Sequence, residues 1–148
     1  MKKVLLFGTF DILHPGHLNL FSQAKRYGKI TVVLARDKTI ENVKKKKPVY
    51  GEDQRKAALE KLGIDVVLGS FGDKYKIIET LKPDIICLGY DQMFFTKELE
   101  SELNKRNINA KIVKLNPYKE HVYKSSKLRK HLDNKNRTNR FLGLKISH

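Results

Sequence analysis

The sequence contains one cysteine in 148 residues, so it cannot form an internal disulfide. Cys87 lies in the apolar run DIICLG, which predicts a small buried hydrophobic side chain. No apolar run approaches the roughly 20 residues of a membrane span, and no charged-then-apolar signal peptide precedes the first apolar run. We therefore expect a cytoplasmic protein that does not contact membranes. Since no carboxylate cluster or Cys/His spacing is present, we predict no metal ligands in the chain.

Acidic residues are scarce: 16 Asp and Glu face 31 Lys and Arg, which gives a net charge of +15. Such an excess raises affinity for polyanions, either nucleic acid or the phosphates of a small substrate. A simple compositional bias toward lysine is the alternative explanation. Basic motifs interleaved with aromatic residues are absent, and no known nucleic-acid-binding module is recognisable. We therefore place a non-enzymatic nucleic-acid binder last among the possible functions.

Apolar runs alternate with helix-like stretches along the first 133 residues. The runs are rich in β-branched residues, as strands covered on both faces are, and they occupy residues 4–7, 30–35, 65–69, 84–89 and 110–115. The helix-like stretches occupy residues 17–28, 52–63, 74–82 and 96–107. This alternation predicts an α/β domain over residues 1–133 with a doubly wound, five-stranded parallel sheet of Rossmann-like type. Residues 134–148 are expected to form a polar, basic tail.

The segment GTFDILHPGHL, residues 8–18, directly follows the first predicted strand. Ligands of doubly wound sheets bind at the carboxyl ends of the strands, which is where this segment must lie. Gly8 allows the backbone to turn and a ligand to approach it closely, and Pro15 suits the start of a helix. Free N–H groups of that helix would then form an anion site. His14 and His17, three residues apart, can converge on one phosphate and donate to its developing charge.

GTFD followed by HPGH resembles the H-x-G-H signature of the nucleotidyltransferase superfamily. The resemblance runs from residue 3 to about residue 132, and it is greatest for archaeal FAD synthases and glycerol-3-phosphate cytidylyltransferases. ARDKTIENVKKKKPVYGEDQR and LKPDIICLGYDQ are more similar to the FAD synthases. Gly63 also stands where some cytidylyltransferases carry an arginine. The resemblance implies the Rossmann-like nucleotidyltransferase fold.

The resemblance also implies roles for individual residues. Four residues are expected to be catalytic. They are the two histidines after the first strand, His14 and His17, and two lysines in the loop after the second strand, Lys44 and Lys46. The histidines and the residues of four further segments are expected to bind the nucleotide: Gly8, Thr9, Phe10, Asp11, Arg55, Gly89, Asp91, Ser125, Ser126 and Arg129.

The resemblance implies a nucleotidyltransferase that works by positioning and charge stabilisation, without a protein nucleophile. We expect it to transfer AMP from ATP to FMN, giving FAD and pyrophosphate. The alternative is a cytidylyltransferase that uses CTP and acts on glycerol 3-phosphate or another small phosphate. Mg²⁺ or another divalent cation is expected to bridge the phosphate oxygens of the nucleotide. A homodimer is usual in the family and is expected here.

Overall fold

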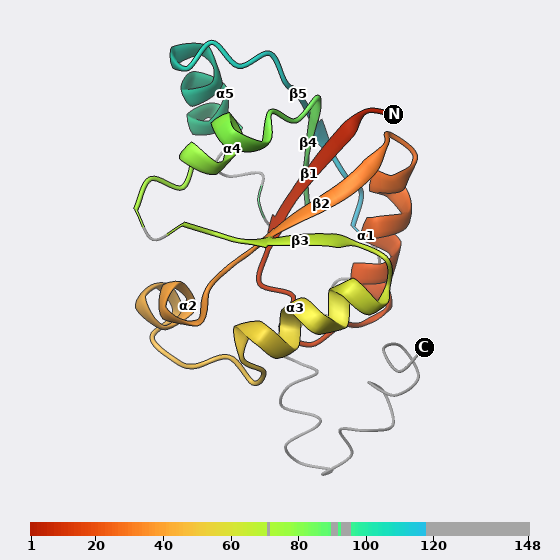
Figure 1. The fold of residues 1–148 in the computed structure, drawn as a ribbon, viewed down its shortest axis with the longest axis vertical. Helices are drawn as coiled ribbons and strands as arrows, with labels where there is room; N and C mark the ends of the chain where they lie inside the picture. The colour runs from red at the N-terminus through yellow and green to blue at the C-terminus, as the bar shows by residue number, and fades with distance from the viewer. Residues whose placement is uncertain (71, 90–91, 93–95, 118–148) are drawn as a thin grey trace.

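The structure is a computed structural model that describes residues 1–70, 72–89, 92 and 96–117. Five parallel strands form one sheet in the order β3-β2-β1-β4-β5 (Figure 1). The strands are β1 (Lys3–Gly8), β2 (Lys29–Leu34), β3 (Asp65–Leu68), β4 (Ile85–Leu88) and β5 (Lys111–Lys114). The predicted doubly wound parallel sheet is therefore confirmed.

Helices cover both faces of the sheet. The covering helices are α1 (Pro15–Lys25), α3 (Glu52–Lys61), α4 (Lys76–Leu81) and α5 (Thr96–Lys105), and a further helix is α2 (Asp37–Lys44). Because successive residues of a strand point to opposite faces, β1 contributes to two cores. Leu6 packs in one cluster with Phe21 of α1 and Leu59 of α3. Leu5 packs in the other with residues of α4 and α5. Cys87 is fully buried in the first cluster, as expected.

The connection between β2 and α3 differs from the prediction. It was expected to be a loop, but residues 37–44 form α2, which buries only Ile40. Its amphipathic pattern is too short and too polar to stand out in the sequence. Lys44 is therefore the last residue of a helix, while Lys46 lies just after the left-handed C-cap residue Lys45. Figure 1 shows α2 beyond the end of β2, beside the sheet rather than over one of its faces.

The chain reverses its direction of winding at β1. β1 pairs with β2 on one side and with β4 on the other. The pairing of β1 with β4 ends at Leu6 and Cys87, so the two strands separate toward their carboxyl ends. This is the position at which open α/β sheets bind ligands. The segment from Gly8 to His17 leaves β1 at this point.

Among the described residues, no helix is long and apolar enough to cross a membrane. The predicted tail, residues 134–148, lies outside the described residues, so the boundary predicted at residue 133 stays a prediction.

Candidate active site

The turn after β1 is shaped by the ring of Phe10. A Cβ atom at Gly8 would lie 2.5 Å from the edge of this ring, so only glycine fits there. Phe10 has a positive φ of 46°, and its side chain is 6% exposed. The ring packs against Phe21 and meets the ring of His17 edge-on, with centroids 5.2 and 5.1 Å away. Both residues were predicted to bind the nucleotide, which stays a prediction; in this structure they shape the turn, and the Phe10 ring contacts His17.

His14 is the N-cap of α1. Its Nδ1 atom accepts a hydrogen bond from the N–H of Gly16 at 3.1 Å. A neutral imidazole with an accepting Nδ1 carries its hydrogen on Nε2, so the cap selects one tautomer. The N–H groups of His17 and Leu18 both donate to the carbonyl of His14. The prediction of free N–H groups in the first turn is therefore wrong, because His14 itself supplies their acceptors.

The structure brings the two predicted histidines together. Their rings stack with centroids 3.8 Å apart and an angle of 26° between the planes. The Nδ1 atom of His17 is buried and has no hydrogen-bond partner among the described residues. A buried polar atom without a partner is uncommon in folded proteins and often marks a functional group. The pair therefore presents imidazole nitrogens at the carboxyl end of β1.

Both imidazoles are neutral at physiological pH. Burial lowers the pKa of His14 from 6.5 to about 4, because the cation loses its hydration. Burial lowers the pKa of His17 further, to about 3, with a smaller contribution from His14 and an opposing one from the Ile12 carbonyl. A neutral imidazole can still donate one hydrogen bond to a phosphoryl oxygen. Such a pair can stabilise the charge that develops on a phosphoryl oxygen in the transition state, without binding the phosphate of the ground state strongly.

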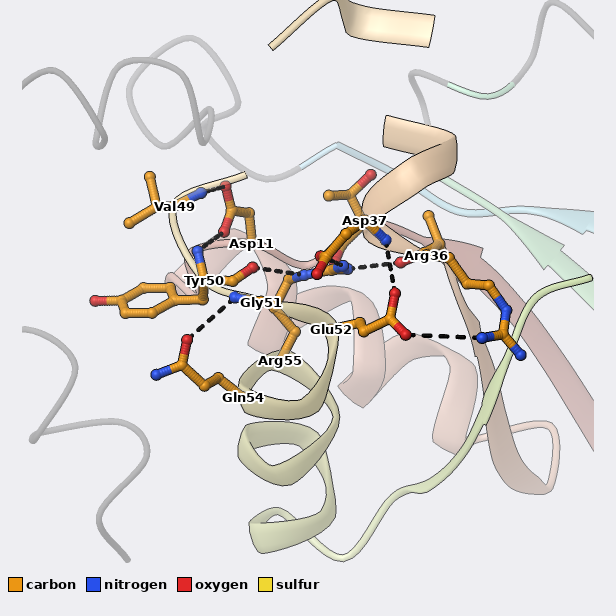
Figure 2. Close-up of polar contacts among 11 residues, drawn as sticks. Asp11, Arg36, Asp37, Val49, Tyr50, Gly51, Glu52, Gln54 and Arg55 are labelled. Atoms are coloured by element: carbon orange, nitrogen blue, oxygen red, sulfur yellow. Dashed lines mark hydrogen bonds and ion pairs between the residues drawn. The ribbon is translucent and has the colours of Figure 1, made fainter. Parts of the chain in front are cut away.

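The carboxylate of Asp11 is directed at the backbone of the segment before α3. It accepts hydrogen bonds from the N–H groups of Val49 and Tyr50, both at 2.8 Å (Figure 2). These contacts tie the segment that follows the lysine run to a residue three positions before His14. Lys44 and Lys46 are exposed side chains in that run. Asp11 was predicted to bind the nucleotide, which stays a prediction, and in this structure its carboxylate binds this neighbouring backbone.

Arg55, in the first turns of α3, points inward, and its side chain is fully buried (Figure 2). Its guanidinium donates four hydrogen bonds of 2.7 to 3.0 Å, to the carbonyls of Tyr50, Thr9 and Ala35 and to Oδ1 of Asp37. Arg55 was predicted to bind the nucleotide, and that contact stays a prediction. Thr9, also predicted to bind the nucleotide, is engaged through its carbonyl in the same network.

Gly89 directly follows β4 and is buried beside the end of β1. Its N–H donates to Oε1 of Gln92 at 3.0 Å, while Nε2 of Gln92 donates to the carbonyl of Phe7 at 2.7 Å. The Gln92 amide thus bridges β1 and β4 where their pairing has ended. We did not single out Gln92 from the sequence, because an isolated glutamine in a loop gives no signal. The other predicted site residues lie outside the described residues: Asp91, Ser125, Ser126 and Arg129.

Within residues 1–70, 72–89, 92 and 96–117, no group of three or more His, Cys, Asp or Glu side chains is placed to hold a metal ion. The carboxylate of Asp11 is already bound to backbone N–H groups, and that of Asp37 is bound to Arg55. A cation held mainly by phosphate oxygens would not need such a group.

Comparison with known proteins gives the family. The profile described as cytidylyltransferase-like matches residues 5–131, which is most of the chain and includes both histidines. The chain belongs to the cytidylyltransferase-like family. The predicted superfamily is thus confirmed, and with it a nucleotidyltransferase.

Curated relatives of the chain include archaeal FAD synthases. It is 47% identical over 121 residues to the FAD synthase of Aciduliprofundum boonei, covering 80% of each chain. It is 48% identical over 118 residues to the FAD synthase of Methanohalophilus mahii, covering 78% of this chain and 82% of the relative.

The solved structures include a similar fold from Thermoplasma volcanium, titled a lipopolysaccharide core biosynthesis protein. It superposes with a TM-score of 0.74 at 42% identity, covering 80% of this chain and 98% of that one.

Proposed function

We propose that this chain is an FMN adenylyltransferase that transfers AMP from ATP to FMN and releases pyrophosphate. The observation that carries the proposal is the 41% to 48% identity to archaeal FAD synthases over about four fifths of the chain. The stacked neutral histidines at the carboxyl end of β1 supply a matching site. No observation favours the alternative reaction of CTP with glycerol 3-phosphate.

In the proposed reaction, a phosphate oxygen of FMN attacks the α-phosphorus of ATP, and the bond from that phosphorus to the β-phosphate oxygen breaks. Both bonds change at one phosphorus, so the protein needs to align the reactants and stabilise charge. His14 would donate to the α-phosphate through Nε2–H, which is the N–H of the tautomer whose Nδ1 caps α1. His17, whose ring stacks on that of His14, would donate to the charge that develops on the same phosphate. Lys44 and Lys46 would pair with substrate phosphates.

The divalent cation is proposed to arrive with the nucleotide, because Mg²⁺ in such sites is held largely by substrate phosphates. When bound, it would neutralise charge on the phosphate oxygens. Gly89 would line the nucleotide at the separated ends of β1 and β4, next to the predicted contact of Asp91. Ser125, Ser126 and Arg129 are proposed to bind the β- and γ-phosphates. A homodimer and a cytoplasmic location remain further predictions.

An assay with each combination of nucleotide and phosphate acceptor tests the proposal. The purified chain is incubated with Mg²⁺ and either ATP or CTP, and with either FMN or glycerol 3-phosphate, while pyrophosphate is measured. Chromatography then detects FAD or the cytidylyl product. We expect pyrophosphate and FAD in equal amounts from ATP and FMN only. Turnover of CTP with glycerol 3-phosphate and none of ATP with FMN would reject the proposal in favour of the alternative.

A further inference from the structure

The segment from Asp37 to Tyr50, which we call the lysine segment, has little apolar packing. Its helix, α2, buries only Ile40, while Val43 is 74% exposed and Val49 is 37% exposed. Lys44 to Lys47 are four consecutive exposed cations, and like charges at this spacing repel one another. Hydrophobic burial therefore contributes little to fixing where these lysines lie. Something polar must hold the segment if its lysines are to act at a defined place.

Arg55 holds both ends of the lysine segment at once. Its Nη2 donates to Oδ1 of Asp37, the first residue, at 2.7 Å. Its Nε donates to the carbonyl of Tyr50, the last residue, at 3.0 Å. Its Nη1 donates to the carbonyls of Thr9 and Ala35, at 2.9 and 2.8 Å, which follow β1 and β2. The planar guanidinium thus links the two ends of the segment to the ends of the two strands beside the histidines.

Asp11 adds a second tie at the end that carries the lysines. Its two carboxylate oxygens accept from Val49 and Tyr50, so both polar backbone groups of Tyr50 are held by charged side chains. Hydrogen bonds to charged groups are among the stronger ones in proteins. At the other end, the carboxylate of Glu52 accepts from the N–H of Asp37 at 2.8 Å. Figure 2 shows these contacts converging from the turn after β1, the start of α2 and the start of α3.

We propose that Asp11, Asp37 and Arg55 are positioning residues that clamp both ends of the lysine segment and so hold Lys44 and Lys46 beside the histidine pair. The proposal rests on the proposed nucleotidyl transfer and deepens it. None of the three residues contacts the substrate. Each acts through the lysines, and this reassigns Asp11 and Arg55 from the nucleotide contacts expected from the sequence.

Native-state proteolysis tests the clamp without any substrate. Trypsin can cleave after Lys44, Lys45 and Lys46, while Pro48 protects the bond after Lys47. In Asp11→Asn, one acceptor oxygen becomes an NH₂ group that faces a backbone N–H, so the segment should open more often. Mass spectrometry measures the rate of cleavage at these three bonds. The rate should rise about tenfold, which corresponds to the loss of one charge-assisted hydrogen bond. Cleavage after Lys56, within α3, should be unchanged.

Asp84→Asn is the matched control. Asp84 also accepts a backbone N–H, that of Lys3 at 2.8 Å, but at the opposite end of the sheet. The Asp84→Asn substitution should leave cleavage in the lysine segment at the wild-type rate. If Asp11→Asn does not fold, Asp37→Ala removes the tie at the other end of the segment and should have the same effect. Equal cleavage rates in wild type and in the folded clamp variant would overturn the proposal.

A double-mutant cycle tests whether the clamp acts through the lysines. We expect Asp11→Asn and Lys46→Ala each to raise the KM for a phosphate substrate about tenfold, with little change in kcat, and the double variant to be no worse than about twofold beyond either one. If the two increases in KM multiply in the double variant, Asp11 acts independently of Lys46. That result would overturn the positioning role. If the wild type transfers no nucleotide but proteolysis behaves as expected, the proposed function fails and the clamp stands.

Discussion

Acidification should destabilise this protein well above the pH at which its carboxylates titrate, because of the two buried histidines. In the unfolded chain each imidazole has a pKa near 6.5, whereas in the folded protein the values are about 4 for His14 and about 3 for His17. Below pH 6.5 the unfolded chain therefore binds protons that the folded protein excludes. Stability must fall as the pH falls, from about 6.5 down to the folded values.

The magnitude follows from proton linkage. One group that is protonated only in the unfolded state costs up to about 1.4 kcal/mol per pH unit. Allowing for partial protonation of the unfolded chain, the two histidines together cost about 2 kcal/mol between pH 6 and pH 5. That is a large part of the roughly 5 to 15 kcal/mol that stabilises an ordinary domain. Asp73, whose pKa is lowered chiefly by its hydrogen bond with Arg106, loses its contribution only below its ordinary pKa of 3.8.

Urea unfolding at pH 7, 6 and 5 measures this loss, and two substitutions provide the control. His14→Asn retains a side-chain acceptor for the N-cap but cannot titrate. His17→Gln removes the second titrating ring. Each variant should lose about half of the pH dependence between pH 6 and 5, and the double variant should lose most of it. A wild type that is equally stable at pH 7 and pH 5 would refute the assignment of two buried neutral imidazoles.

Three further results are expected. His17→Ala should lower the turnover of ATP and FMN by about 10² or more, because it removes a donor to the transition state; a near-wild-type kcat would reject the role of the histidine pair. Gly8→Ala places a Cβ 2.5 Å from the Phe10 ring, and displacing this ring should cost about 1 to 3 kcal/mol in thermal unfolding and lower kcat through His17. An unchanged melting temperature would show that the turn relaxes freely. Removal of residues 134–148 should preserve nucleotidyl transfer, since every matched motif precedes them, and loss of folding or activity in that assay would contradict this expectation.

The sequence by itself determined the fold class and the centre of the site. Five apolar runs separated by helix-like stretches specify a parallel sheet, because strands covered on both faces must be apolar throughout. The position of HPGH after the first strand places two histidines at the carboxyl end of the sheet. The spacing in the sequence was sufficient to predict that the two histidines lie together, since both belong to one short turn.

Only the tertiary structure decided what Asp11 and Arg55 do. A motif shows that an arginine is present but not whether its guanidinium faces a ligand or the protein. The acceptors of Arg55 come from Thr9, Ala35, Asp37 and Tyr50, which converge only when β1, β2, α2 and α3 have packed. Buried carbonyls need donors, and this buried guanidinium supplies them. Non-local hydrogen bonding of this kind leaves no periodicity in the sequence, and so it became visible only in the folded chain.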